Sequence, residues 1–239
     1  MLLSKPTSRR KFLLSSLIAL PALGVTVKGL SAAAAAEMIA PDLLSYAPTF
    51  FSPAEWAFIM AACDQLIPAG GKAPGALETN VPVFMDQQLA GDLGSEIYLE
   101  GPFDLNAPKT LGYQIPYVPQ QIYRKGIAAV NAWCQSAHHG NFAALDSSTR
   151  IEVLKKVQAG DIDFKAFGED ILQSKVFFHE MLSLAQQGYL ADPIYGGNKG
   201  MKAWIAIGFP GARASYLEWV AQHNVPYPLG PVSLNGSRG

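Results

Sequence analysis

A block of 24 residues near the end of the chain, 188–211, combines many chain-bending residues with aromatic ones. It contains six glycines and two prolines, and Tyr, Trp and Phe side chains stand between them. A flexible linker is polar and poor in aromatic residues, so this composition predicts an ordered loop. The Asp-Pro pair at 192–193 favours a turn. The Gly-Gly-Asn run at 196–198 can adopt left-handed backbone, which predicts a positive φ at Gly196 or Gly197.

Four apolar side chains in the second half of the block can bury the returning chain against a core. They are Met201, Trp204, Ile205 and Ile207. We therefore expect the block to be a scaffolded surface feature with Trp204 as its anchor.

Outside this block the apolar residues recur mainly at helical spacing, so we predict a mostly α-helical domain with long, ordered Pro/Gly-rich loops. The run Ser-Pro-Ala-Glu at 52–55 combines an N-cap, a proline at the first helical position and a capping-box glutamate. It predicts a helix that begins at Pro53 and ends before Pro68. No stretch shows sustained strand alternation.

Five further helices are predicted from the same spacing. They are Val81–Leu89 with Asn80 as its cap, Pro119–Ala137 ended by His138-His139-Gly140, a helix from the Asp146 cap through Gln158, Phe164–Gln187, and Ala212–Gln222. Residues 225–239 form a Pro/Gly tail. The long segment 91–118 carries the aromatic residues Tyr98, Phe103, Tyr113 and Tyr117, and such loops are usually functional or covered by a partner.

The first 36 residues have the layout of an export signal. Arg9, Arg10 and Phe12 lie in the run Ser-Arg-Arg-Lys-Phe-Leu-Leu, which matches the twin-arginine consensus. The apolar run 12–27 has 16 residues, fewer than the ~20 that span a bilayer. The three alanines at 34–36 suit cleavage. We predict a signal peptide at 1–36 and one helical domain at 37–239, with an uncleaved membrane anchor as the alternative.

The export route limits what the rest of the chain can be. The twin-arginine pathway moves folded proteins, typically because a cofactor is inserted in the cytoplasm or because a partner travels with them. Residues 1–36 hold five basic and no acidic residues, which leaves 13 basic and 19 acidic residues after them. The resulting charge of −6 argues against nucleic-acid binding.

Motifs for a resident cofactor are missing from the sequence. The glycine spacing does not give the Gly-x-Gly-x-x-Gly of a dinucleotide site, and the Gly-Gly-Lys at 70–72 lacks the remainder of a phosphate loop. Cys63 and Cys134 are too far apart for covalent haem and too few for an iron–sulfur cluster. They remain open as buried thiols, as an intrachain disulfide, or as a contact with a partner.

Catalytic and metal-binding patterns are missing as well. His179-Glu180 lacks the second histidine of a zinc-protease helix, and His138-His139 fits a helix C-terminus better than a metal site. No catalytic, cofactor-binding or metal-binding residue is therefore expected in this chain. Of the two usual reasons for twin-arginine export, a partner that travels with the chain is the one left. We expect it to contact loop 98–118, the glycine-rich block and the apolar tail.

The glycine-rich block also carries a family resemblance. The residues are Tyr195, Gly196, Gly197 and Asn198, then Trp204, and then Ile207, Gly208, Phe209, Pro210 and Gly211. This pattern resembles the gluconate 2-dehydrogenase subunit 3 family, the small subunits of membrane-bound, FAD-dependent sugar-acid dehydrogenases. Segments 64–68, 74–76 and 177–192 extend the resemblance over most of the chain after residue 50.

The resemblance implies a non-catalytic small subunit at the outer face of the cytoplasmic (inner) membrane, in the periplasm. It would accompany a large FAD-containing subunit and a multihaem cytochrome c subunit, in a complex that oxidises D-gluconate to 2-dehydro-D-gluconate and passes electrons to quinone. This chain would engage the Tat translocase and stabilise the flavoprotein, and it would associate with the membrane through the complex. The alternatives are a related sugar-acid or polyol dehydrogenase, a periplasmic binding or structural protein without a redox partner, and a free-standing periplasmic enzyme.

Overall fold

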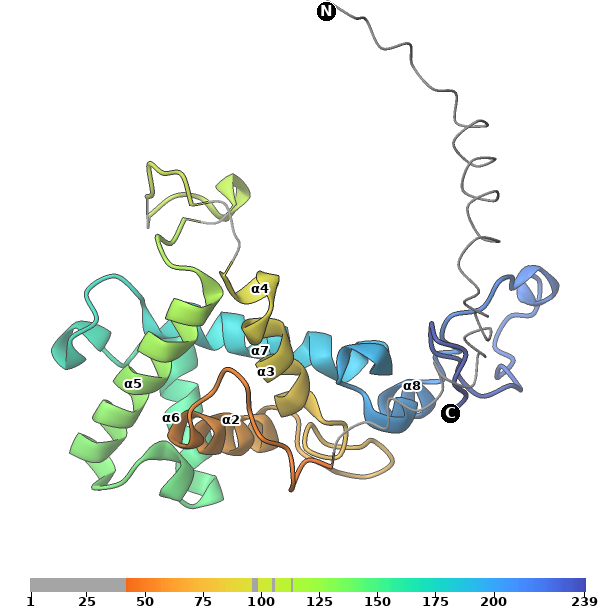
Figure 1. The fold of residues 1–239 in the computed structure, drawn as a ribbon, viewed down its shortest axis with the longest axis horizontal. Helices are drawn as coiled ribbons and strands as arrows, with labels where there is room; N and C mark the ends of the chain where they lie inside the picture. The colour runs from red at the N-terminus through yellow and green to blue at the C-terminus, as the bar shows by residue number, and fades with distance from the viewer. Residues whose placement is uncertain (1–41, 96–98, 105, 113) are drawn as a thin grey trace, which may run out of the picture. The chain divides into compact units, whose positions relative to one another are not determined.

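The helices of this protein meet around one aromatic core. The computed structural model describes residues 42–95, 99–104, 106–112 and 114–239. In these ranges it has α-helices and no strand, which confirms the mostly α-helical prediction (Figure 1). The helices are α2 (Pro53–Leu66), α3 (Val81–Ala90), α4 (Asp92–Ser95), α5 (Pro119–His138), α6 (Ser147–Ala159), α7 (Ser174–Leu190) and α8 (Lys202–Ile207). The export-signal residues Arg9, Arg10 and Phe12 lie outside the described residues.

The core lies where α2, α3, α5, α6 and α7 pack against one another (Figure 1). Phe58 from α2, Tyr123 from α5 and Phe177 from α7 are among its largest buried side chains. The ring centroids of Tyr123 and Phe177 are 6.1 Å apart in an edge-to-face arrangement. Such aromatic contacts add to the stabilisation from burial alone.

Local capping signals place the helix starts correctly. At α2 the Ser52 N–H donates to the Glu55 carboxylate over 2.8 Å, and the Glu55 N–H donates back to the Ser52 hydroxyl, as the capping box predicts. Asp146 accepts a hydrogen bond from the Thr149 N–H over 3.0 Å and so begins α6. Asn80 does precede α3, but its φ is 57° and its side chain does not cap the helix.

One predicted helix begins too early, and another is absent. The run 164–187 is broken: a 3-10 helix, Phe164–Phe167, ends at Gly168 with a φ of 85°, and α7 begins only at Ser174. The segment 212–222 contains only a 3-10 turn, Leu217–Trp219. Leu217 is 84% exposed there, so the segment lacks the core contacts that stabilise a short helix.

A buried carboxylate on α3 holds the segment that precedes α2. Asp86 on α3 accepts hydrogen bonds from the Tyr46 hydroxyl over 2.7 Å and from the backbone N–H groups of Thr49, Phe50 and Phe51 over 2.7–3.0 Å. Its side chain is fully buried. Since a buried charge is stable only when its hydrogen bonds are satisfied, segment 46–51 belongs to the fold.

The two cysteines are buried free thiols in this structure. The Cys63 sulfur lies 3.5 Å from the Met85 sulfur, and burial raises the pKa of Cys134 to about 11. Of the alternatives that the sequence left open, the structure therefore matches buried thiols. In the part of the chain that is described, no helix has both the length and the apolar composition needed to span a membrane.

Candidate functional site

The glycine-rich block 188–211 begins in the last residues of α7, continues through tight turns and includes α8. Left-handed backbone recurs along it, at Gly196, Asn198, Gly200, Met201, Gly208 and Gly211. The φ of Gly196 is 89°, which confirms the prediction of a positive φ in the Gly-Gly pair. The predicted turn at 192–193 is also present, since Asp192 caps the 3-10 helix Pro193–Tyr195 by accepting from the Ile194 N–H. The block is thus ordered, as its composition predicts.

One set of side chains in the block points inward and ties α7 to α8. The fully buried Asn198 donates from its amide to the Ala191 carbonyl over 3.0 Å and accepts from the Ala203 N–H over 2.9 Å. The buried Trp204 donates from its indole N–H to the Leu190 carbonyl over 2.8 Å. These contacts confirm Trp204 as the anchor of the returning chain.

The backbone of the block packs without spare room at Gly197. A Cβ at this position would lie 2.2 Å from the carbonyl oxygen of Gly188 on α7, far inside van der Waals contact. Two residues further on, the Lys199 N–H donates to the Thr79 carbonyl over 3.1 Å, just before α3. The block therefore joins α3, α7 and α8.

A second set of side chains points outward. Tyr195, Ile205, Ile207 and Phe209 are 49%, 54%, 61% and 45% exposed. The expectation that Ile205 and Ile207 bury the returning chain is therefore wrong, whereas Met201 and Trp204 are buried. Helix α8 has six residues and rests on the core by one face, so its other apolar residues face away.

Exposed apolar side chains continue along the chain from the block into the tail. Of the 14 large apolar residues that are exposed in the described ranges, ten lie between residues 190 and 234. These ten, called the apolar surface below, are Leu190, Tyr195, Ile205, Ile207, Phe209, Leu217, Val220, Val225, Leu229 and Leu234. This part of the chain therefore supplies most of the apolar side chains that a partner protein could cover.

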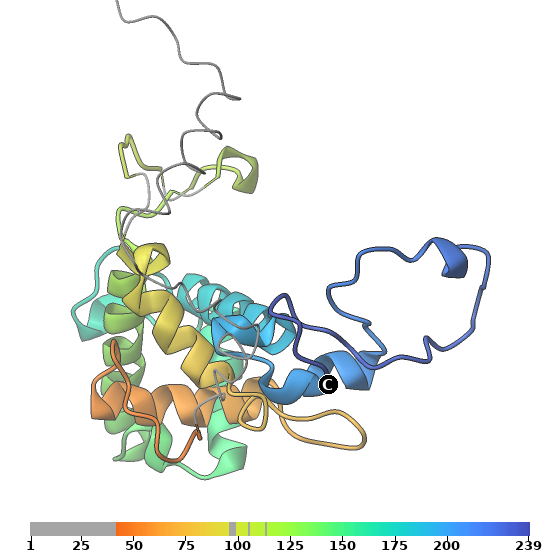
Figure 2. The ribbon, with the colours of Figure 1, turned by 45° about the vertical axis from the view of Figure 1, so that its right-hand side comes forward.

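The tail is held to the block at its far end. Figure 2 shows it leaving α8 as a wide loop and returning to it. The Asp192 carboxylate accepts from the Ser233 hydroxyl and from the Leu234 N–H, the latter over 2.7 Å. A cleft of about 270 Å³ lies between α8 and the tail, with Phe209 and Tyr227 in its walls.

The buried carboxylate of the block is satisfied within the fold. This carboxylate, Asp192, is occupied by three hydrogen-bond donors. Among the residues that the structure describes, no group of three or more His, Cys, Asp and Glu side chains is placed to hold a metal ion. Exposed apolar and aromatic side chains on an ordered scaffold suit contact with another protein.

Part of the aromatic loop 98–118 packs against the chain's own helices. Tyr117 donates to the Glu169 carboxylate over 3.0 Å, and the Lys125 ammonium lies 4.5 Å from the centre of the Tyr117 ring. Tyr98 and Tyr113 lie outside the described residues.

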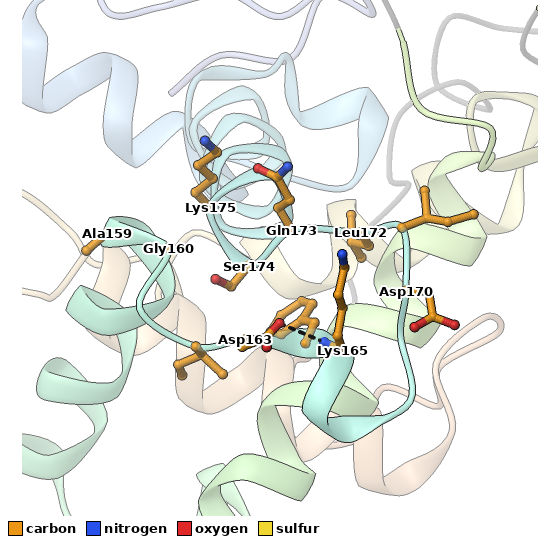
Figure 3. Close-up of a pocket in the computed structure, with 12 residues that line it drawn as sticks. Ala159, Gly160, Asp163, Lys165, Asp170, Leu172, Gln173, Ser174 and Lys175 are labelled. Atoms are coloured by element: carbon orange, nitrogen blue, oxygen red, sulfur yellow. Dashed lines mark hydrogen bonds between the residues drawn. The ribbon is translucent and has the colours of Figure 1, made fainter. Parts of the chain in front are cut away.

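The structure also contains a cavity that the sequence did not indicate. It has a volume of about 380 Å³ and lies between the end of α6, the 3-10 helix Phe164–Phe167 and the start of α7 (Figure 3). Asp163, Lys165, Asp170, Ser174 and Lys175 are among the residues that line it. The sequence pattern predicted a continuous helix through this region, so it gave no reason to expect a cavity there.

Comparison with known proteins gives one match. The family model described as gluconate 2-dehydrogenase subunit 3 matches residues 53–211, from the first residue of α2 to the last residue of the glycine-rich block. The match covers 159 of the 239 residues. No curated protein and no solved structure matched the chain.

Proposed function

Because the chain belongs to the gluconate 2-dehydrogenase subunit 3 family, we propose that it is the non-catalytic small subunit of a periplasmic gluconate 2-dehydrogenase complex. In this proposal the complex oxidises D-gluconate to 2-dehydro-D-gluconate. FAD on the large subunit accepts the hydride, and the haem c groups of the cytochrome subunit pass electrons towards quinone. This chain stabilises the flavoprotein and associates with the membrane through the complex.

The observation that carries the proposal is the extent of the family match. It includes α2 to α8 and the whole block 188–211, so the fold and the block are covered together. The apolar surface adds independent support for assembly with another protein. Apolar and aromatic side chains that a folded chain leaves exposed suit the core of a protein–protein interface.

The export part of the proposal rests on Arg9 and Arg10. A flavoprotein needs its FAD before it crosses the membrane, and a chain with a twin-arginine signal can carry a folded partner through the same pore. We propose that the large subunit reaches the periplasm in this way.

Replacing Arg9 and Arg10 together by lysine tests the escort role. We expect both this chain and the large flavoprotein to remain in the cytoplasm, measured by immunoblotting of cell fractions and by gluconate-dependent dye reduction in the periplasm. Lys5→Arg is the matched control, since it alters a basic residue outside the motif and should leave export unchanged.

One outcome would contradict the escort role. A flavoprotein that reaches the periplasm with full activity beside the Arg9→Lys, Arg10→Lys variant shows that it does not depend on this signal. Purification of the tagged wild-type chain adds a second readout. The complex should carry flavin and haem absorbance, and a chain that brings down neither is not a subunit of such a complex.

A further inference from the structure

A groove lies between the described part of loop 98–118 and one face of α7. Its volume is about 790 Å³, and Gln158 near the end of α6 also lines it. Much of the lining is apolar, with contributions from Ile115 on the loop and from Val176, Phe178 and Leu182 on α7. An apolar groove with a few polar groups in it is the usual form of a site that receives another molecule.

One carboxylate in this groove has no counter-charge. Glu180 on α7 is half-buried, and its carboxylate takes part in no hydrogen bond or ion pair with the described residues. Lys175 is the one lysine or arginine among the described residues that line the groove. It precedes Glu180 by five residues, which is more than one helical turn. Burial raises the pKa of Glu180 above its ordinary value, and the neighbouring His179 offsets this only in part.

Glu169 shows how this chain treats a buried carboxylate when it supplies the partners itself. The Lys125 ammonium lies 2.7 Å from the Glu169 carboxylate, and the Tyr117 hydroxyl donates to it over 3.0 Å. Glu180 has no equivalent of either contact within the described residues. A charge that is partly removed from water is stabilised by a cation nearby, so the groove is complementary to a cation from outside the chain.

We propose that this groove receives a segment of the large flavoprotein subunit that places an arginine or lysine side chain against Glu180. Apolar residues on either side of this cation pack against Val176, Phe178 and Leu182. Apolar anchors and arginine are typical of the residues that dominate binding energy. Both walls of the groove lie within the residues that the family model matches. The identity of the partner rests on the proposed function, whereas the chemistry of the segment follows from the groove.

Titration of the full chain with the large subunit tests the contact. Glu180→Gln keeps the shape of the side chain and removes its charge, so it should weaken binding about tenfold or more. Glu180→Arg brings like charges together and should weaken binding about a hundredfold or more. Glu152→Gln is the matched control, because this glutamate is exposed on α6 and does not line the groove. It should leave the affinity unchanged.

Thermal melting of the unbound full chain separates the contact from the fold. Glu180→Gln should leave the melting temperature unchanged or higher, since it removes a half-buried charge that has no partner in the chain. Weaker binding together with an unchanged melting temperature therefore reports the loss of a contact with the large subunit.

Photochemical cross-linking locates the segment in the assembled complex. Benzoylphenylalanine in place of the exposed His179 should become joined to a large-subunit peptide with an arginine or lysine between apolar residues, identified by mass spectrometry. The same group in place of Glu152 should not give this product. Replacing the identified basic residue by glutamate should weaken binding to the wild-type chain and restore binding to Glu180→Arg.

The outcomes separate this inference from the proposed function. A large subunit that does not bind the wild-type chain contradicts the proposed function and the inference together. A large subunit that binds the wild-type chain, Glu180→Gln and Glu180→Arg equally well leaves the proposed function intact and overturns the inference. A cross-link from position 179 to a segment without a basic residue, or to a different subunit, overturns it as well.

Discussion

At the scale of single residues, Glu169 shows how one side chain can break a helical pattern. Its carboxylate is 4% exposed. It accepts from the Lys125 ammonium over 2.7 Å, from the Tyr117 hydroxyl, and from the backbone N–H groups of Ile171 and Leu172. Burial alone raises the pKa of Glu169, but these donors outweigh it and hold the pKa near 2. The turn between the 3-10 helix and α7 is therefore fixed to α5.

Glu169→Gln should lower the free energy of unfolding by about 2–4 kcal/mol at pH 7, because it leaves Lys125 without its carboxylate. The pKa of Glu169 is lower in the folded chain than its ordinary value of 4.5. Its stabilisation is thus complete above pH 4.5 and is lost as the pH falls toward 2. Urea unfolding of the wild-type chain and of Glu169→Gln should show that the difference between their free energies of unfolding shrinks from pH 7 to pH 3. The exposed Glu152→Gln is the control, with a change within about 0.5 kcal/mol. A gap that does not depend on pH would exclude the carboxylate as its cause.

At the scale of elements, the helices that the sequence predicts well are those with their own end signals. Helix α2 has a capping box, α6 has the Asp146 cap, and α5 ends at His139 in left-handed backbone. The break before α7 could not be predicted from local capping residues. It depends on Lys125, which is 44 residues from Glu169 in the sequence.

Some features of the glycine-rich block were likewise predictable from the sequence, and others were not. The positive φ of Gly196 and the burial of Trp204 follow from residue type and spacing, and both were predictable. The exposure of Ile205 and Ile207 was not, because it depends on which face of α8 meets the core. The predicted helix at 212–222 is absent for a similar reason, since the apolar side chains there have no core to pack against.

The inward and outward residues of α8 should respond differently to mutation. Trp204→Ala should lower the free energy of unfolding by about 3–5 kcal/mol, because it removes a buried indole and its hydrogen bond. Ile207→Ser should change it by less than about 0.5 kcal/mol but weaken binding to the flavoprotein about tenfold or more. Thermal melting and titration with the large subunit measure the two effects. Unchanged affinity in both Ile207→Ser and Phe209→Ser would leave the block with a folding role only.

At the scale of the whole molecule, the end of the tail is tied to the glycine-rich block by hydrogen bonds, among them those from the Ala212 N–H to the Val232 carbonyl and from the Val232 N–H to the Pro210 carbonyl. Asp192 supplies the side-chain part of this attachment, since it accepts from both Ser233 and Leu234 across about 40 residues of sequence. The intervening chain has exposed apolar side chains and little regular structure. Such segments open more easily than a helical core.

Asp192→Ala should therefore release the tail while the core helices stay folded. We expect limited proteolysis between residues 212 and 229 to become about tenfold faster or more, because two hydrogen bonds to a carboxylate are lost. Ser233→Ala removes one of them and should give an intermediate rate. Equal rates in all three proteins would mean that other contacts hold the tail in place.

The carboxylate of Asp86 has a mechanical consequence. Among the described residues, Tyr46 is the first that is hydrogen-bonded to a helix of the core, and Thr49, Phe50 and Phe51 share the same acceptor. A force applied to the chain from its N-terminal side meets the folded body first at segment 46–51, where Arg124 also donates to the Phe50 carbonyl and the Tyr46 ring lies 5.4 Å from that of Trp56. The four hydrogen bonds to Asp86 share that load with these contacts, so the core helices bear it only after segment 46–51 has detached.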